Sequence, residues 1–305
     1  MTLSLVKTQF DIPQNTHLRI FESRDTADSP NWRVSNLSGG TTRTVPGGLN
    51  NLSDGYYNIF TKRFGSYQNN TGIIREYPES TFDTVSTTQT RSVTITGTVG
   101  ADTEGISDPE PNFLEGDHSN YTCDESGGAN RSYRVEWDRS DLTGTIDIVA
   151  KTVRATRTHA VAASGNNEGT EGVDWNPFTD QVLAVQEGRQ IDNPLAFLYT
   201  EPADRDTDIA YNTGLTVINP YNAQAVLDPG HDQSSCLFHR PTNTYLVLSE
   251  TGDTIYQIDA TTQLEIDRLS IAGDMTQPEG LCMYFDNLVV WGEPDEYRVY
   301  QYTAP

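Results

Sequence analysis

The sequence predicts an all-β protein that folds as a single five-bladed β-propeller. Three observations lead to this prediction. One short unit recurs along the chain, each copy is followed by strand-like segments separated by turns, and no longer segment repeats its apolar residues with a helical period of 3.6. The residue types agree, because Thr and Tyr suit a pleated surface whereas Gly, Asn and Asp suit turns.

The recurring unit begins with a step of small residues. Three copies contain Glu-Gly, a fourth contains Ser-Ser, and a fifth, weaker copy contains Gly-Gly. In chain order the copies are Pro-Gly-Gly-Leu-Asn (46–50), Thr-Glu-Gly-Ile-Ser (103–107), Thr-Glu-Gly-Val-Asp (170–174), Ser-Ser-Cys-Leu-Phe (234–238) and Pro-Glu-Gly-Leu-Cys (278–282).

Each step leads through a turn to a short apolar strand that ends in an acid, as in QVLAVQE at 181–187. A third strand and, where it can be traced, a fourth strand follow, such as EIDRLSI at 265–271. Four short strands per unit at even spacing are typical of propeller blades. The predicted blades lie near 46–97, 103–158, 170–228, 234–272 and 278–305.

The last unit reaches Pro305 after only three strands. An N-terminal strand must complete that blade, because an open edge would expose unpaired backbone groups. We assign this closing strand to THLRIFES at 16–23. The propeller then covers 15–305, residues 1–14 form a short N-terminal arm, and 24–45 form a connecting loop.

The pattern resembles the SdiA-regulated family of β-propellers, which is related to the esterase-like phytase propellers, over about residues 45–305. The resemblance is carried by ITGTVGADTEGIS (95–107), NNEGTEGVDWNPFTDQVLAVQE (166–187), SSCLFHRPTNTYLVLSETGDTIYQID (234–259) and TQPEGLCMYFDNLVVWGEPDEYRVYQY (276–302). It implies five blades and channel acids that can hold Ca²⁺. The chain departs from the family at Gly47 and Ser235, which stand where other units have Glu, and its N-terminus lacks the family's anchor or export signal.

The innermost strand of each blade lines the axis of a propeller, so equivalent residues form rings. The first ring comprises Gly47, Glu104, Glu171, Ser235 and Glu279. A second set at the strand ends comprises Glu125, Glu187, Glu250 and Glu293, with Lys62 or Arg63 in the first blade. Six of these acids are our candidate ligands for Ca²⁺, a cation that prefers oxygen donors: Glu104, Glu171, Glu279, Glu187, Glu250 and Glu293.

Two other roles for these acids stay open. Each Glu could bond backbone N–H groups of the neighbouring blade and lock the blades together without a metal. A catalytic pair is the third reading, but acid–base pairs need two unlike environments, whereas repeated acids have similar ones.

No residue is assigned a catalytic role. His231 and Asp232 precede Ser234 and Ser235, but the nucleophile elbow of a hydrolase is missing. The acidic run DRDTDIAYN at 204–212 lacks the Gly and the final Glu of an EF-hand loop, so we expect a solvated loop. Three cysteines are too few and too scattered to indicate a disulfide framework.

The formal net charge of −23 and a pI near 4.4 exclude nucleic acid and anionic membranes as natural partners. No stretch of 18 apolar residues exists, so we expect no membrane insertion. The N-terminus lacks a signal-peptide pattern, which predicts synthesis in a cytoplasm. The polar composition, rich in Thr, Asn and Tyr, resembles that of proteins that end up outside a cell, and release of virions by lysis reconciles these two expectations.

Three functions follow as hypotheses. The first is a non-enzymatic structural or adhesive propeller of a larger assembly, such as a tail, fibre or decoration protein of a tailed virus, which contacts protein subunits through its arm and a ligand on the host surface. The second is a Ca²⁺-dependent hydrolase of the esterase or phytase type, although the predicted channel supplies almost no basic groups for phosphate. The third is a soluble cellular ligand-binding propeller.

Overall fold

The structure is a computed structural model, and strands dominate it. It describes residues 31–45, 51–58, 61–69, 71–82, 89, 91–96, 103–107, 110–112, 117–124, 131–137, 148–158, 169–186, 196–210, 216–218, 232–303 and 305. Within these ranges, complete helices are limited to two short 3₁₀ turns, η3 (Val34–Asn36) and η4 (Glu79–Thr81). The expectation of an all-β chain is confirmed.

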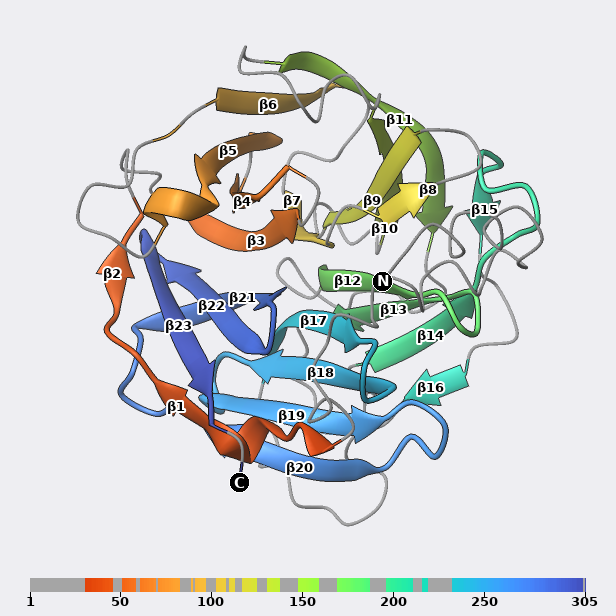
Figure 1. The fold of residues 1–305 in the computed structure, drawn as a ribbon. Helices are drawn as coiled ribbons and strands as arrows, with labels where there is room; N and C mark the ends of the chain where they lie inside the picture. Colours follow the sequence, from red (N-terminus) through yellow and green to blue (C-terminus); the bar gives the residue numbers. More distant parts are fainter. Residues whose placement is uncertain are drawn as a thin grey trace, which may run out of the picture.

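Five blades surround a central axis, and each blade runs from an innermost strand outward (Figure 1). Blade I contains β3 (Leu52–Asn58), β4 (Arg63–Gln68), β5 (Ile73–Pro78) and β6 (Arg91–Thr96). Blade II contains β7 (Thr103–Ile106), β9 (Asp117–Asp124), β10 (Arg131–Trp137) and β11 (Ile148–Thr158), with β8 (Glu110–Asn112) beside β9. Blade III contains β12 (Thr170–Asn176), β13 (Gln181–Gln186), β14 (Ala196–Thr200) and β16 (Thr216–Ile218). Blade IV contains β17 (Gln233–His239), β18 (Thr244–Ser249), β19 (Thr254–Asp259) and β20 (Glu265–Ser270). Blade V contains β21 (Gln277–Tyr284), β22 (Asn287–Glu293) and β23 (Glu296–Tyr302), followed outward by β1 (Leu37–Gly39).

Blade V is closed from the N-terminal side, as expected, but the segment that closes it is β1. This strand pairs with β23 in antiparallel register, with Leu37 opposite Tyr302, and β2 (Arg43–Thr44) pairs further along the same strand. These strands occupy the place that we assigned to residues 16–23, which lie outside the described residues. The loop expected over 24–45 is therefore wrong at 37–39 and 43–44, where the chain forms strands.

The residues before β1 are held firmly against blades IV and V. Trp32 is fully buried, its indole N–H donates to the carbonyl of Asp286 (2.9 Å), and its ring lies 4.3 Å from that of His239. The backbone N–H of Val34 donates to the buried side-chain oxygen of Gln257 (3.1 Å). The closing segment is thus fixed by packing as well as by strand pairing.

Outer strands of blades I and III pair with the outer strand of blade II, which the repeat pattern did not predict. β6 pairs in parallel with the first half of β11, so the outer edges of blades I and II join in one ten-stranded sheet. β15 (Ile209–Ala210) comes from the third unit but pairs in parallel with β11 of blade II, opposite Arg157 and Thr158. Part of the third unit thus lies in the sheet of blade II.

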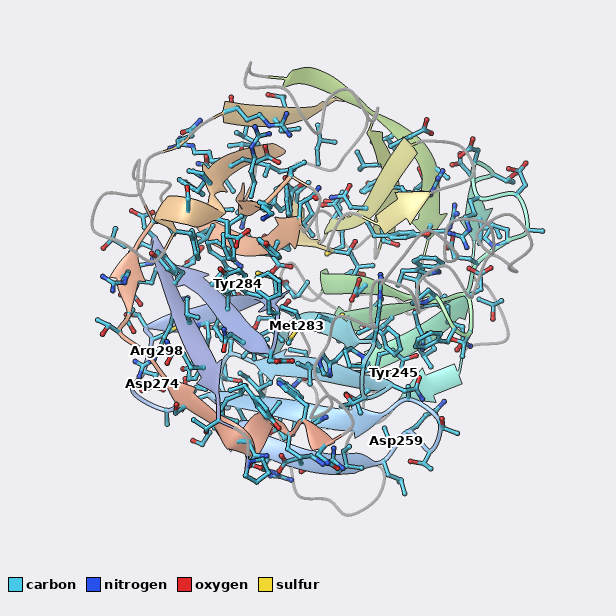
Figure 2. All side chains as sticks on the ribbon, viewed as in Figure 1. Tyr245, Asp259, Asp274, Met283, Tyr284 and Arg298 are labelled. Carbon is cyan, nitrogen blue, oxygen red and sulfur yellow. The ribbon has the colours of Figure 1, made fainter. Side chains whose placement is uncertain are left out.

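The core lies between neighbouring blades. Every residue of β18 is buried, because both faces of a propeller blade pack against other blades. Leu246 and Leu248 of β18 share one apolar cluster with Leu288 and Val290 of β22. An ion pair at the periphery, between Arg298 and Asp274 (3.1 Å), ties the loop between blades IV and V to β23 (Figure 2).

Candidate functional site

A bulge marks the beginning of the innermost strands and locates the acids of the repeat. In β12, β17 and β21 the register with the second strand slips by one residue, so that Glu171, Ser234 and Glu279 are extra residues in their strands. The same slip occurs in β3 around Ser53. The first copy of the unit is therefore Ser53-Asp54-Gly55, rather than residues 46–50, which lie outside the described residues.

The glycine of the step is needed because innermost strands of neighbouring blades almost touch there. A Cβ atom on Gly172 would lie 2.7 Å from the Cα atom of Ser235, and one on Gly280 would lie 2.5 Å from the Cα atom of Asp54. A Cβ atom on Gly105 would lie 2.8 Å from the Cα atom of Gly172. The recurrent Gly thus reflects close approach of two backbones.

Asp54 stands at the glycine position in blade I, and its carboxylate joins four blades. Its Oδ1 accepts the N–H groups of Gly55 (2.7 Å) and Leu281 (3.1 Å), and its Oδ2 accepts that of Ile106 (2.9 Å). The hydroxyl of Ser235 lies 3.5 Å from Oδ2. Asp54 is only 1% exposed, and sequence reasoning missed it, although an Asp-Gly pair beside an apolar strand was the available signal.

Asp174 makes a second link of the same kind between blades III and IV. Its Oδ1 accepts the N–H of Trp175 (2.8 Å) and its Oδ2 accepts the N–H of Phe238 (2.5 Å). Blade-locking by carboxylates, one of the three roles considered for the repeated Glu residues, is therefore observed at Asp54 and Asp174.

The predicted candidate acids lie at the beginning of the innermost strands and at the end of the second strands. Glu104 and Glu171 are largely buried, and Glu104 accepts a hydrogen bond from the side-chain amide of Asn69. Burial and the charge of Glu250 raise the pKa of Glu293. Five of the six candidates are described, namely Glu104, Glu171, Glu250, Glu279 and Glu293, and Glu187 lies outside the described residues, as does Glu125.

Asn69, and not Lys62 or Arg63, takes the strand-end position in blade I. It directly follows β4, as Glu250 follows β18, whereas Lys62 and Arg63 lie at the opposite end of β4. Arg63 instead approaches the buried carboxylate of Glu76 at 3.5 Å.

No group of three or more His, Cys, Asp or Glu side chains among the described residues is arranged to hold a metal ion. The described part of the candidate set therefore does not by itself fit a closed Ca²⁺ centre, and Ca²⁺ binding stays a prediction.

The serines and cysteines noted in the sequence are engaged in structure. Ser234 donates to the carbonyl of Pro278 (2.9 Å), and Ser235 faces Asp54, while His231 lies outside the described residues. Cys123, Cys236 and Cys282 are buried free thiols, as the absence of a disulfide framework predicted. Burial raises the pKa of Cys123 and Cys236 well above the ordinary value, which disfavours the reactive thiolate.

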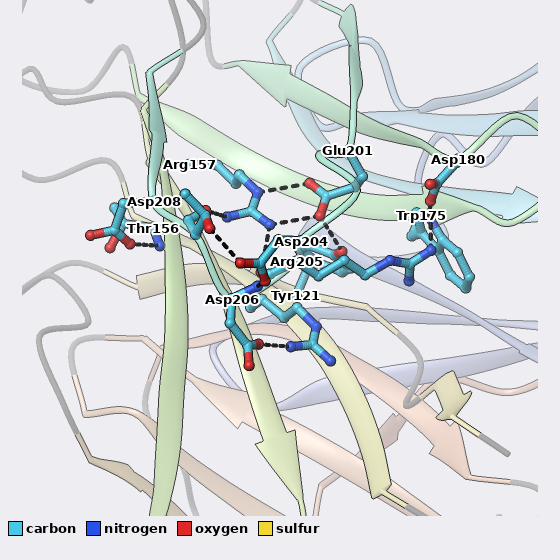
Figure 3. A network of polar contacts seen from close by, with 12 residues as sticks. Tyr121, Thr156, Arg157, Trp175, Asp180, Glu201, Asp204, Arg205, Asp206 and Asp208 are labelled. Atoms are coloured by element: carbon cyan, nitrogen blue, oxygen red, sulfur yellow. Dashed lines mark hydrogen bonds and ion pairs between the residues drawn. The ribbon is translucent and has the colours of Figure 1, made fainter. Parts of the chain in front are cut away.

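The acidic run that begins at Asp204 belongs to a loop that fastens blade III to blade II (Figure 3). Glu201, just before it, forms a two-pronged ion pair with Arg157 of β11 (2.8 and 2.7 Å), and both side chains are fully buried. Arg157 also donates to the carbonyls of Arg205 and Thr207 (both 2.9 Å). One guanidinium thus binds the loop at three points.

The Asp side chains of this loop contact protein groups. Asp206 pairs with Arg134 (2.6 Å), and Asp208 accepts the backbone N–H of Thr156 (2.7 Å). Their exposed surfaces agree with the expected solvated loop, but the carboxylates form an interblade fastening.

His239 should make the folded state sensitive to mild acid. It is buried, it shares a 2.7 Å hydrogen bond with Thr242, and burial lowers its pKa to about 3. The unfolded chain therefore binds a proton at His239 near pH 6.5, whereas the folded protein does not. The contribution of neutral His239 to the free energy of unfolding is present above pH 6.5 and is lost as the pH falls. We expect the free energy of unfolding to fall by about 1.4 kcal/mol per pH unit below 6.5.

Urea unfolding at pH 7.5 and 5.5 measures this effect. The loss between these two values should be larger in the natural protein than in His239→Asn by about 1 kcal/mol. An equal loss in both proteins would show that His239 is not the responsible group.

Five blades of mainly antiparallel strands around one axis, entered through a glycine step, define the class: this is a β-propeller. The sequence pattern of the family described as SdiA-regulated matches residues 101–301. This match covers more than half of the chain, so the chain belongs to the SdiA-regulated family, as the resemblance indicated. A comparison with curated proteins finds no significant match.

Solved structures with related architecture differ greatly in sequence. The chain is similar to luciferin-regenerating enzyme (11% identity, TM-score 0.49, 88% of this chain and 98% of that chain). It is also similar to the PQQ-bound aldose sugar dehydrogenase of Streptomyces coelicolor (11%, 0.49, 87% and 98%). The β-propeller domain of Myceliophteria thermophila Cps50 (Swd1) gives 17% identity and a TM-score of 0.42, with 83% of this chain covered and only 65% of that chain spanned.

These similarities to solved structures do not assign an activity to this chain. No helix in the described ranges is long and apolar enough to cross a membrane.

Proposed function

We propose that this chain is a non-enzymatic structural or adhesive β-propeller of a larger assembly, and that the assembly is a particle of a tailed virus. One observation carries the non-enzymatic part of the proposal. The carboxylate of Asp54 accepts backbone N–H groups from three blades and is shielded from solvent. A carboxylate held in this way stabilises the ring and is poorly placed to exchange protons with a substrate.

The other groups that could do chemistry support the same proposal. Ser234 is bound to a carbonyl, the described thiols are buried, and His239 is a neutral side chain under Trp32. None of these described groups forms a nucleophile with an adjacent base.

An attachment through the N-terminal region is consistent with where the closing segment lies. Ser35, in η3, binds Asp267 of the outer strand β20 through its N–H (3.0 Å) and its hydroxyl (2.7 Å). The described chain therefore begins beside blades IV and V. We propose that residues 1–14 contact neighbouring subunits.

The candidate acids would form a negatively charged entrance at one end of the axis, which we call the acidic mouth. Glu104, Glu171 and Glu279, with the strand-end acids, would attract cations such as Ca²⁺ to this end of the axis. The proposed structural role does not require a bound metal.

Native mass spectrometry of the full chain, compared with a chain that begins at residue 31, tests the assembly. We expect the full chain to associate as its concentration rises, and the shorter chain to remain a monomer with the same unfolding midpoint. A full chain that stays monomeric at all concentrations would count against the proposal.

Hydrolase assays test the competing function. Hydrolysis of p-nitrophenyl esters or phosphates that is lost both with EDTA and in Glu171→Gln would overturn the non-enzymatic proposal. We expect no turnover above the uncatalysed rate, with or without Ca²⁺.

A further inference from the structure

The most exposed large apolar side chain in the described part of the protein is Phe285, which is 55% exposed. It is the first of two residues in the turn between β21 and β22, and its φ angle is +54°. This left-handed conformation is unfavourable for a bulky residue. The turns at the same end of blades I, III and IV place other residue types at positive φ, namely Lys62, Asp180 and Asn243.

Because the ring of Phe285 is exposed, its burial offsets little of the unfavourable free energy of this backbone conformation. Glycine or asparagine would fit the turn better. Residues held in unfavourable backbone conformations cluster at functional sites, so the outlier points to a contact outside the isolated protein.

Phe285 is supported from below by two tyrosines that share one carboxylate. Its ring centroid lies 5.0 Å from that of Tyr284 and 5.9 Å from that of Tyr57. The hydroxyl of Tyr57 donates to Glu79 Oε2 (2.7 Å) and that of Tyr284 donates to Glu79 Oε1 (3.3 Å; Tyr284 is labelled in Figure 2). Burial and Glu79 raise the pKa of Tyr284, which keeps it a hydrogen-bond donor. The inner side of the phenyl ring is thus fixed and its outer side is free for a partner.

The charges around the ring are mainly negative. Asp286 follows Phe285 directly, and its carboxylate forms no hydrogen bond or ion pair within the described ranges. Glu79 is only partly buried. Lys62, in the neighbouring turn, accepts the N–H of Glu79 at its carbonyl (2.9 Å), but its ammonium pairs with neither acid. The protein as a whole has a formal net charge of −23.

An aromatic face beside unneutralised carboxylates is a good fit for a guanidinium group. Arginine stacks on aromatic rings and pairs with carboxylates, and its weak hydration lowers the penalty for leaving water. The negative field of the whole protein would also speed the encounter with a basic partner.

We propose that Phe285 and Asp286, supported by Tyr57, Tyr284 and Glu79, form a docking surface for an arginine side chain of a basic protein partner. This surface lies at the end of β21 opposite Glu279, so it is separate from the acidic mouth. The proposal rests on the proposed function, because it gives the chemistry of one partner in the assembly.

Nuclear magnetic resonance of the full chain with labelled phenylalanine rings tests this docking surface. The probe is the peptide acetyl-Gly-Arg-Gly-Arg-Gly-amide, and the matched neutral probe contains citrulline in place of arginine. We expect the arginine peptide to shift the Phe285 signals, to bind more weakly as salt is added, and to bind at least tenfold more tightly than the citrulline peptide. Lys62→Ala should tighten binding several-fold.

Phe285→Asn separates recognition from folding. We expect binding to weaken at least tenfold, while the unfolding midpoint stays equal to that of the natural protein or rises, because asparagine tolerates positive φ. Leu264→Asn removes another exposed apolar side chain, on blade IV, and should leave peptide binding unchanged.

Three results would overturn the proposal. A lower unfolding midpoint in Phe285→Asn with unchanged peptide binding would make the ring a packing element. Equal binding of the citrulline peptide would make the patch a general apolar surface, and shifts caused only by a neutral sugar such as methyl glucoside would assign a different ligand. Because defined peptides are used, this test can fail while the mass spectrometry supports the assembly, and the reverse also holds.

Discussion

Asp54→Ala should lower the free energy of unfolding by about 4 kcal/mol, because it removes a charged acceptor and leaves buried donors without partners. The natural carboxylate accepts N–H groups from Gly55, Ile106 and Leu281, which belong to three blades. Urea unfolding, followed by tryptophan fluorescence, measures the loss.

Two further variants make this prediction specific. Asp54→Asn keeps one oxygen but turns an amide N–H₂ toward a backbone donor, so we expect a loss between those of the natural protein and Asp54→Ala. Asp267→Asn alters a partly buried Asp whose carboxylate binds Ser35, and it should change stability by less than about 1 kcal/mol. A loss below about 1 kcal/mol in Asp54→Ala would show that the axial hydrogen bonds contribute little to the closed ring.

The repeat unit predicted the fold well because its signal is local. A glycine fits the close approach of two innermost strands at Gly105, Gly172 and Gly280, and so it recurs in three of the five blades. The apolar second strands repeat for the same reason, since both faces of a blade are covered. These constraints can be read from one unit without knowledge of its neighbours.

The site and the closure were harder to predict because they depend on contacts between distant units. The first copy was placed at 46–50, since Ser53-Asp54-Gly55 lacks the Glu of the other units although it forms the same bulge. Residues 16–23 had the stronger strand pattern, yet the short strand Leu37–Gly39 pairs with β23. The N–H of Leu281 donates to Asp54 across 227 positions of the chain, and no pattern within one unit predicts this hydrogen bond.

The resemblance to the family drew attention to repeated Glu residues, whereas the observed blade-locking carboxylates are Asp54 and Asp174. An acid at the bulge can accept a hydrogen bond from a side chain, as Glu104 does from the side-chain amide of Asn69. Asp54, one residue after the bulge of its strand, and Asp174, three residues after, instead accept backbone N–H groups of neighbouring innermost strands. A shift of one position in a strand therefore changes the role of a carboxylate, which composition and spacing alone could not resolve.

Arg157→Met should lower the free energy of unfolding by about 3–5 kcal/mol, because it leaves the buried carboxylate of Glu201 without its cationic partner. The hydroxyl of Tyr121 (3.0 Å) would still donate to that carboxylate. Arg157 and Glu201 are fully buried, and Arg157 also holds the carbonyls of Arg205 and Thr207. The loop that fastens blade III to blade II should then open before the rest of the ring unfolds. Trypsin, which cleaves after arginine, should cut at Arg205 much faster in the variant than in the natural protein.

The double variant Arg157→Met with Glu201→Leu distinguishes a lost ion pair from lost packing. Replacing both charges by apolar groups of similar size should restore most of the stability, since the unpaired charge is the main penalty. The loop carbonyls would still lack their donor, so cleavage at Arg205 should remain faster than in the natural protein. Arg268→Met removes an exposed pair with Glu265 and should change stability by less than about 1 kcal/mol. If the double variant were as unstable as Arg157→Met, the loop contacts rather than the buried charge would hold blades II and III together.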